Sequence, residues 1–303
     1  MGSAVEVEDL RKSYGPVEAV RGISFTVAEG EVFALLGPNG AGKTTTVEIL
    51  EGFRRRDGGR VSVLGFDPAS GARRLKEQMG IVLQTTGVDP YLTVAETVDM
   101  FRGYYPKPRP RSDVIKQVGL EDKTSTRVTR LSGGQRRRLD VAIALAGDPR
   151  VLFLDEPTTG FDPGAKRNAW DVIKGLAGLG KTIFLTSHSM DEVQFLADRV
   201  VIIAAGKIVA EGTPESLMGR QQADTMIRFR HAGTLPEMVR TGAHIDGDAV
   251  EIVTRDPTRT LYELTSWAVQ NGVMLEGLQV TRPSLEDVYL EITKEAEAAR
   301  ATA

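Results

Sequence analysis

The stretch GPNGAGKTT (Gly37–Thr45) follows the apolar run EVFALL and decides the fold. Glycines let successive backbone N–H groups turn toward one centre, which makes a nest for an anion. The chain then enters a helix, expected over about Gly42–Leu50, whose N-terminal dipole end also favours negative charge. Lys43 can reach the outer phosphates of a nucleotide, and the Thr44 hydroxyl can bind Mg²⁺. Strand, glycine-rich loop and helix in this order predict a loop that binds a nucleoside triphosphate.

The loop as a whole is expected to contact the nucleotide. A glycine-rich turn that binds nothing is the alternative, but the strand before the loop and the helix after it argue against that alternative. The expected contact residues are Gly37, Pro38, Asn39, Gly40, Ala41, Gly42, Lys43, Thr44 and Thr45.

A second apolar run, PRVLFLDE, ends in two adjacent carboxylates, Asp155 and Glu156. A continuous apolar run is typical of a strand buried in a parallel sheet. Asp155 is expected to hold Mg²⁺ through a water molecule, together with the phosphate loop. Glu156 is expected beside the γ-phosphate, where it can polarise the attacking water. The alternative is that the two acids only solvate the end of a strand.

A second loop of small residues, LSGGQ, precedes the segment RRRLDVAIALAGDP, which is expected to be helical. Its N-terminus is a second phosphate-binding end on the same chain. One nucleotide does not need two such ends from one subunit, whereas a head-to-tail pair of chains can place both on one γ-phosphate. Such a pair is two-fold symmetric and closes on itself. The residues expected at this second end are Ser132, Gly133, Gly134 and Gln135.

The helix after LSGGQ has an apolar face formed by Leu139, Ile143 and Ala146. The run Arg136–Arg138 is expected to be a solvated face of that helix, with at most one arginine near the nucleotide or a neighbouring molecule.

Composition limits the classes of protein that remain. The chain has 303 residues, 41% hydrophobic and 26% charged, with a formal net charge of −3. This balance is ordinary for a globular protein and argues against a nucleic-acid partner. The absence of cysteine excludes disulfides and thiolate metal sites. No apolar run approaches the length of a membrane span, so any membrane crossing is expected from another chain.

The order of strands and helices predicts an α/β fold with a parallel sheet. We expect a phosphate-loop NTPase (RecA-like) core with an N-terminal β subdomain and an inserted helical subdomain, over residues 1–220. The helical subdomain is expected at about residues 90–150, with Thr93 and Glu96 as a capping box. RVVIIAAG and KIVAEG are expected to form a hairpin.

A smaller α/β domain is expected over residues 221–293. Its predicted elements, in order, are the strand TMIRFR, a helix beginning at TLPEMV, the strand AVEIVT, the helix PTRTLYELTSWAVQN stopped by Gly272, the strand GVMLEGLQVT and the helix PSLEDVYLEIT. Residues 294–303 are expected to be a flexible tail.

Taken together, these motifs resemble the ATP-binding subunits of ABC transporters over roughly Val5–Gly212. The resemblance implies ATP and Mg²⁺ as cofactors. Tyr14, in KSYG, matches the aromatic that stacks on adenine. Gln84, in VLQ, matches the glutamine that contacts Mg²⁺ and the attacking water.

The same resemblance implies two further roles. Asp162, in TTGFDP, matches the aspartate loop that crosses the dimer. His188, in TSHSMDE, matches the histidine that contacts the γ-phosphate and supports Glu156. Phe161 stands where leucine is commoner in the family, a difference expected to be benign.

The C-terminal segment RPSLEDVYL narrows the resemblance to the daunorubicin-resistance exporter ATPases. That group implies a homodimer in the ATP-bound state, a separate transmembrane permease subunit, and a peripheral position on the cytoplasmic face of the plasma membrane. The alternative is that this segment is only structural, a helix whose apolar face of Leu285, Val288 and Ile292 packs into the core. A soluble ABC ATPase and an importer ATPase also stay open, although the single cassette and the absence of sustained heptads disfavour the soluble class.

Overall fold

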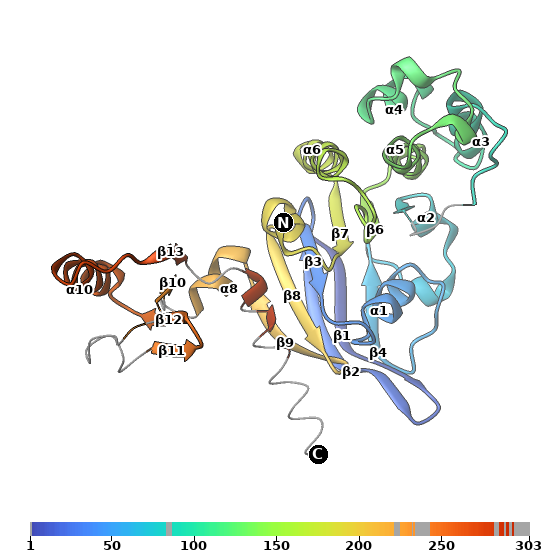
Figure 1. Cartoon of the computed structure of the whole chain (residues 1–303). Helices are drawn as coiled ribbons and strands as arrows, with labels where there is room; N and C mark the ends of the chain where they lie inside the picture. Colours follow the sequence, from blue (N-terminus) through green and yellow to red (C-terminus); the bar gives the residue numbers. More distant parts are fainter. Residues whose placement is uncertain are drawn as a thin grey trace. The chain divides into compact units, whose positions relative to one another are not determined.

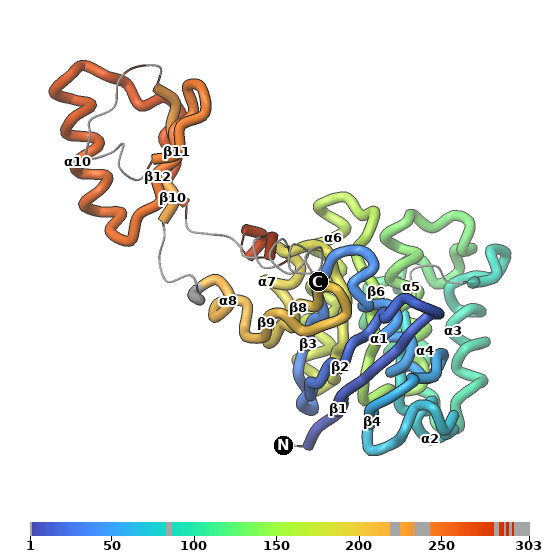
Figure 2. Tube along the Cα trace, turned by 90° about the horizontal axis from the view of Figure 1, so that it is seen from below, coloured from blue at the N-terminus to red at the C-terminus, as the bar shows by residue number. Residues whose placement is uncertain are grey.

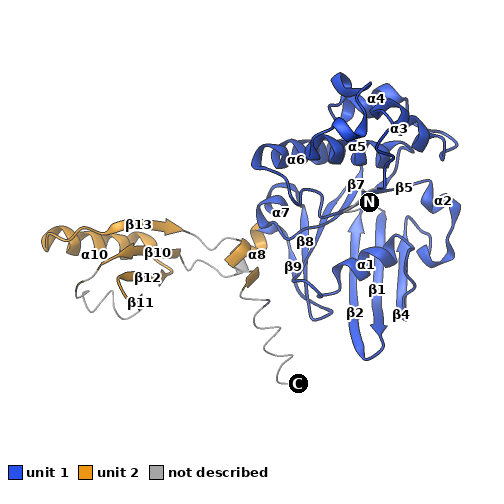
Figure 3. Cartoon of the chain, turned by 45° about the vertical axis from the view of Figure 1, so that its right-hand side comes forward, with its two compact units in different colours: residues 1–214, 292–303 blue, residues 215–291 orange. Residues whose placement is uncertain are grey.

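The computed structural model describes residues 2–82, 87–220, 225–231, 233, 243–281, 285–287, 289–290 and 293. The chain divides into two compact units, residues 1–214 with 292–303, and residues 215–291 (Figure 3). Each unit has its own hydrophobic core, as a separately packed domain requires.

The larger unit begins with a three-stranded antiparallel sheet in the order β2-β1-β4. The strands are β1 (Ser3–Tyr14), β2 (Val17–Ala28) and β4 (Gly58–Val63). Along β1, Val5 and Val7 are buried whereas Glu6 and Glu8 are exposed. This alternation is expected of a strand with one face on the core and one face in water.

A six-stranded sheet follows, in the order β5-β6-β7-β3-β8-β9 (Figure 1). The first five strands in that order are parallel, and β9 is antiparallel to β8, which confirms the predicted hairpin. The bounds are β3 (Val32–Leu36), β5 (Met79–Val82), β6 (Val151–Asp155), β7 (Thr182–Thr186), β8 (Arg199–Ala204) and β9 (Lys207–Gly212).

Phenylalanine rings join the two sheets of the larger unit into one core. The Phe33 and Phe184 ring centroids are 5.1 Å apart, and those of Phe153 and Phe184 are 5.5 Å apart. Phe25, on β2, stacks on Phe33 at 5.2 Å. Aromatic contacts of this geometry add to the stabilisation from burial. Because β3, β6 and β7 are parallel, the loops that follow their carboxyl ends meet at one edge of the sheet.

Helices and short 3-10 turns connect the strands of the larger unit. They are α1 (Lys43–Leu50), α2 (Arg73–Lys76), α3 (Val94–Arg102), α4 (Arg111–Gln117), α5 (Gly133–Leu145), α6 (Pro163–Gly178) and α7 (Met190–Leu196), with short 3-10 turns η1 (Pro68–Ser70), η2 (Glu121–Lys123) and η3 (Val128–Arg130). The predicted helix after the phosphate loop is therefore confirmed, and α2 was not predicted.

The inserted helical segment lies between β5 and β6 in the chain. Its α3 and α4 pack on each other and on α5, and the three gather at one side of the larger unit (Figure 1 and Figure 2). The predicted capping box opens α3: Thr93 Oγ1 accepts from the Glu96 N–H at 3.2 Å, and Glu96 Oε2 accepts from the Thr93 N–H at 2.8 Å.

The smaller unit has a four-stranded antiparallel sheet in the order β11-β12-β10-β13. Its elements are α8 (Pro214–Arg220), β10 (Thr225–Arg230), β11 (Ala243–Asp246), β12 (Ala249–Thr254), α10 (Pro257–Gln270) and β13 (Glu276–Thr281). The core residues are Ile227, Phe229, Val250, Ile252 and Leu264.

Several sequence expectations for this unit are confirmed and others are corrected. The strands TMIRFR and AVEIVT and the helix stopped at Gly272 are present. The predicted strand GVMLEGLQVT is shorter in the structure. β13 begins at Glu276, and Gly272–Leu275 lie outside the sheet. β11 was not predicted. The expected helix start at TLPEMV, and Val288 and Ile292 of the expected C-terminal helix, lie outside the described residues, whereas Leu285 is buried.

In the part of the chain that the structure describes, no helix is both long enough and apolar enough to cross a bilayer.

Candidate active site

The phosphate loop leaves the buried strand β3 at Leu36, and two of its glycines are required by close packing. A Cβ on Gly37 lies 2.3 Å from the carbonyl oxygen of Ile203, and a Cβ on Gly42 lies 2.4 Å from that of Ala19. Gly42 also has φ +104°, a backbone conformation that L side chains rarely adopt. The loop is therefore held tightly against β8 and β2, and α1 begins directly after it.

Lys43 lies inside the loop rather than in solvent. Its side chain is 8% exposed, and Nζ donates to the carbonyls of Gly37 at 2.6 Å and Pro38 at 3.1 Å. Burial lowers the pKa of Lys43, while the negative charges of Glu156 and Asp155 act in the opposite direction. The loop lysine and the two carboxylates thus act on one another.

The three threonines at the end of the loop have different environments. Thr46 is fully buried and its hydroxyl donates to the Gly42 carbonyl at 2.8 Å, so it supports the first turn of α1. Thr44 is exposed, which leaves its hydroxyl accessible to a ligand. Thr45 is half-buried, and its Oγ1 lies 3.4 Å from the Tyr14 hydroxyl.

Tyr14, at the end of β1, lies beside the phosphate loop. Its ring is flanked by two cations, the Arg54 guanidinium at 5.2 Å from the ring centroid and Lys12 Nζ at 5.7 Å. Its side chain is 41% exposed. An accessible ring beside the loop can stack on a base.

The two carboxylates stand at the end of β6, Asp155 as its last residue and Glu156 directly after it, at the edge of the sheet where β3 also ends. Thr186, the last residue of β7, donates its hydroxyl to Asp155 Oδ1 and so orients that carboxylate. The Glu156 side chain lies 3.5 Å (Oε1) from Nδ1 of His188, and its Oε2 accepts from the Thr159 hydroxyl at 3.1 Å. The fold therefore brings Asp155, Glu156 and His188 to one place, as the sequence predicts for them. Gln84 lies outside the described residues.

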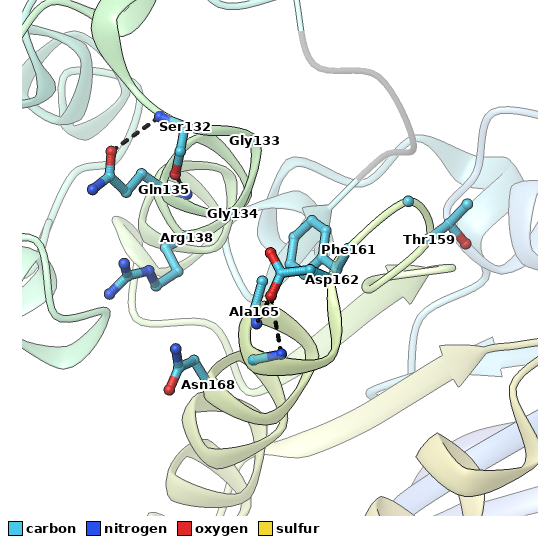
Figure 4. A pocket seen from close by; sticks show the side chains of 12 residues that line it. Ser132, Gly133, Gly134, Gln135, Arg138, Thr159, Phe161, Asp162, Ala165 and Asn168 are labelled. Carbon is cyan, nitrogen blue, oxygen red and sulfur yellow. Dashed lines mark hydrogen bonds between the residues drawn. The ribbon is translucent and has the colours of Figure 1, made fainter.

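The LSGGQ loop opens α5 through a capping box, in which Ser132 Oγ accepts from the Gln135 N–H at 3.2 Å and Gln135 Oε1 accepts from the Ser132 N–H at 3.0 Å. Asp162 caps α6, with Oδ1 accepting from the N–H groups of Gly164 and Ala165 at 3.0 and 2.9 Å. These two helix starts face a common pocket of about 610 Å³ (Figure 4).

The pocket at Ser132 and Asp162 is separate from the phosphate loop. Its described lining comes from residues 132–138 and 159–168, and none of it from residues 37–45. One chain therefore presents two separate groups of helix N-termini, the start of α1 after the phosphate loop and the starts of α5 and α6 at this pocket.

The arginine run after LSGGQ does not form the solvated face that the sequence predicts. Arg136 is exposed, but Arg137 is only 8% exposed and donates to backbone carbonyls at the end of β6. The prediction for Arg137 is wrong because α5 packs its middle arginine against the strand end, where its donors find carbonyl acceptors.

A buried acid that sequence reasoning missed supports the loop around His188. Glu192, on α7, is 1% exposed. Its Oε1 accepts from the Thr158 hydroxyl at 2.7 Å and from the Trp170 indole N–H at 3.0 Å, and its Oε2 accepts from the Ser187 hydroxyl at 2.5 Å. Ser187 in turn accepts from the Ser189 N–H at 3.0 Å. Both sequence neighbours of His188 are thus held in place.

We expect Glu192→Ala to lower the free energy of unfolding by about 3 kcal/mol, because three donors, two of them buried, lose their acceptor. Urea unfolding measures this loss. Glu192→Gln is the matched control, since its amide oxygen can still accept from Thr158 and Trp170, and it should cost less than half as much. Equal stability of the alanine variant and the unmodified protein contradicts the assigned network.

A second buried acid, Glu51, directly follows α1 and is 5% exposed. Burial, and then the negative charges of Asp155 and Glu48, raise the pKa of Glu51 to about 8. The folded chain therefore holds a proton on Glu51 that the unfolded chain releases at lower pH. The resulting contribution to stability is fully present below about pH 4.5 and is lost as the pH rises toward about 8.

We expect Glu51→Gln to remove this pH dependence. Relative to the variant, the unmodified protein should lose up to about 1.4 kcal/mol of unfolding free energy for each pH unit from 5 to 8. Urea unfolding across this range measures the difference. A difference that does not change with pH contradicts the raised pKa.

Comparison with known proteins finds a different family match in each unit. The family described as ABC transporter matches residues 20–159. The family described as ABC transporter domain-containing protein-like, C-terminal domain, matches residues 225–284.

Two relatives and a solved structure match this chain over most of their own length. A daunorubicin resistance ATP-binding protein of Streptomyces coeruleorubidus is 36% identical, covering 96% of this chain and 95% of the relative. A Nod factor export ATP-binding protein of Rhizobium johnstonii is 38% identical, covering 96% and 94%. A Clostridium perfringens structure, described as part of the ABC transporter complex cbiONQ, matches with a TM-score of 0.65 and 29% identity, covering 73% of this chain and 93% of that one.

The phosphate loop, the paired carboxylates and the LSGGQ helix start occur together in a chain with these relatives. The chain therefore belongs to the ATP-binding subunits of ABC transporters, which are ATPases coupled to transport, and within them to the group that contains resistance and export proteins.

Proposed function

We propose that two copies of this chain bind two MgATP at a shared interface and drive the export of hydrophobic compounds through a separate membrane subunit. The observation that carries the pairing is the pocket at Ser132 and Asp162, which is separate from the phosphate loop of the same chain. A head-to-tail pair places the phosphate loop of one chain opposite this pocket of the other. The arrangement is two-fold symmetric and closed.

The nucleotide is held mainly by backbone dipoles in this proposal. The N–H groups of Gly37–Thr45 and the start of α1 surround the phosphates. Lys43 leaves the carbonyls of its own loop for the outer phosphates, where a charge-assisted hydrogen bond is stronger than one to a neutral carbonyl. Tyr14 stacks on the adenine.

The residues near the loop fit a magnesium ion bound together with ATP. Mg²⁺ usually takes only one or two carboxylates and completes its shell with substrate phosphates and water. The exposed Thr44 hydroxyl and the oriented Asp155 carboxylate match that requirement, and Gln84 is assigned by family resemblance. When bound, the ion neutralises phosphate charge.

Hydrolysis is assigned to Glu156 and His188. Glu156 orients the attacking water in line with the γ-phosphate and accepts its proton. His188, whose Nδ1 lies 3.5 Å from Glu156 Oε1, is placed to hold that carboxylate and to contact the γ-phosphate. Loss of the phosphate that bridges the two chains then allows the pair to separate.

Export and a membrane partner are supported by the relatives, whose names include daunorubicin resistance and Nod factor export. The inserted helical segment offers exposed aromatic side chains, Tyr91 at 74% and Tyr104 at 71%, as contacts for a membrane subunit. The complex places this chain peripherally on the cytoplasmic face of the plasma membrane.

Purification of the tagged chain, in parallel from detergent-solubilised membranes and from ribosomes, tests the partner. We expect a polytopic membrane protein to co-purify with it. Enrichment on ribosomes instead favours a soluble ABC ATPase.

Inside-out vesicles test the direction of transport. ATP should drive uptake of a fluorescent hydrophobic amphiphile into vesicles that contain the complex, and Glu156→Gln should abolish that uptake. ATP-driven uptake only into right-side-out vesicles loaded with ATP indicates an importer.

A further inference from the structure

A buried guanidinium holds the backbone on both sides of Glu156. Arg137, on α5, donates through Nε to the Pro157 carbonyl at 3.1 Å and through Nη2 to the Asp155 carbonyl at 3.0 Å. These carbonyls belong to the residues directly before and after Glu156. A planar fork of donors is suited to bridging two acceptors in fixed geometry, whereas a lysine ammonium is not.

Glu156 has an unusual backbone conformation that needs such support. Its φ is +45°, in the left-handed region that non-glycine residues adopt when their surroundings impose it. Its N–H donates to the Thr186 carbonyl at 3.1 Å and to the Thr186 hydroxyl at 3.2 Å. Strand β7 therefore holds the N–H of Glu156, and Arg137 holds the carbonyls on either side.

Burying the cation demands compensation within the fold. Burial lowers the pKa of Arg137, but a guanidinium stays protonated in proteins. Asp140, three residues along α5 and 5% exposed, places Oδ2 3.7 Å from Nη1 of Arg137. A buried ion pair is weak support for stability in itself, so its fixed geometry is the more informative property.

Arg137 is also joined rigidly to the LSGGQ end of the same helix. Arg137 stands five positions after Ser132, which is about 7.5 Å along the helix axis at 1.5 Å per residue. A shift of the Ser132 end of α5 therefore moves the guanidinium and the carbonyls that it holds.

We propose that Arg137 is a positioning residue for ATP hydrolysis, which aligns Glu156 through the backbone on both sides and ties that alignment to the Ser132 end of α5. The inference rests on the proposed function, in which Ser132 contacts the nucleotide of the other chain. Glu156 of one chain then becomes aligned when Ser132 of the same chain engages the nucleotide held by its partner. The two nucleotide sites of a pair are coupled by this link.

Arg137→Lys keeps the charge near Asp140 and removes the fork. We expect kcat for ATP hydrolysis to fall about 10- to 100-fold, the scale of a misplaced catalytic group. The Kd for ATP should change less than about threefold, because Arg137 does not touch the phosphate loop. Should Arg137→Lys unfold, the double variant Arg137→Met with Asp140→Asn removes both charges together and should show the same loss of kcat.

Arg102→Lys is the matched control. Arg102 also donates to a backbone carbonyl, that of Arg109 at 2.7 Å, and pairs with an aspartate three residues away, Asp99 at 2.5 Å. It lies on α3, and among the described residues its hydrogen bonds and ion pair go to Arg109 and Asp99, not to the end of β6. We expect some loss of stability, without a loss of kcat.

A double-variant cycle separates positioning from a general structural defect. If Arg137 acts through Glu156, Arg137→Lys should not lower further the residual rate of Glu156→Gln. The proposal is overturned if Arg137→Lys lowers the hydrolysis rate by the same factor in the unmodified protein and in the Glu156→Gln variant, or if Arg137→Lys alone leaves kcat unchanged.

Ser132→Arg distinguishes this failure from failure of the proposed function. Hydrolysis abolished by Ser132→Arg but untouched by Arg137→Lys refutes the positioning role and leaves the paired site standing. Full hydrolysis in Ser132→Arg refutes the paired site and with it the coupling between sites.

Discussion

Glu156→Gln should lower ATP turnover by roughly 10²–10⁴-fold, the usual scale for loss of a general base. The amide keeps nearly the same shape but cannot accept the proton of the attacking water. ATP binding should be preserved, because the phosphate loop and Lys43 are unchanged. Steady-state phosphate release and titration with a fluorescent ATP analogue measure the two quantities.

The same variant should accumulate as an ATP-bound pair, since the bridging phosphate is no longer removed. Glu77→Gln, on a surface ion pair with Arg73, serves as the control and should hydrolyse ATP normally. Near-normal turnover in Glu156→Gln contradicts the role assigned to that carboxylate.

Lys43→Ala should weaken ATP binding itself by about 10- to 100-fold, because a hydrogen bond to a charged group contributes about 1.5–3 kcal/mol. The expected effect is on Kd, which sets this variant apart from Glu156→Gln. Equilibrium titration with a fluorescent ATP analogue provides the measurement.

Lys181→Ala is the control for this change, since Lys181 is paired with Asp148 at 2.8 Å and takes no part in the phosphate loop. It should bind ATP as the unmodified protein does. An unchanged affinity in Lys43→Ala contradicts the assignment of the phosphate loop.

The phosphate loop was predictable because its chemistry depends on the backbone. Gly37 and Gly42 are required by contacts closer than any Cβ tolerates, so glycine spacing alone indicates the local shape. The place of His188 beside Glu156 came from the family resemblance. The parallel sheet gives its physical reason, because strand ends in such a sheet converge on one edge.

The supporting residues were not predictable from local pattern. Arg137 stands in a run of three arginines, and such runs are typical of solvated helix faces. Only the packing of α5 against the end of β6 buries the middle one. Glu192 stands in the first turn of a helix, where acids are common for a different reason, the helix dipole. Its three donors come from separate segments of the chain.

In the smaller unit, one short strand could not be predicted from the sequence. β11 is a four-residue strand, Ala243–Asp246, with little apolar character, and it is recognisable mainly through its pairing with β12. Alternation over so few residues is a weak signal. The larger strands of this unit, whose buried residues form its core, were predicted correctly.

Complementation between two inactive variants tests the shared site most directly. Lys43→Ala lacks a working phosphate loop, and Ser132→Arg lacks a working LSGGQ end. In a mixed pair, the loop of the Ser132→Arg chain faces the intact LSGGQ end of the Lys43→Ala chain. The account predicts little hydrolysis by either variant alone and, in an equal mixture, a rate above both parents but below about a quarter of normal. Half of randomly formed pairs are mixed and each has one intact site, but Glu156 of that site lies in the Ser132→Arg chain, whose own Ser132 end is not engaged. Full hydrolysis by Ser132→Arg alone, or a mixture as inactive as both parents, contradicts it.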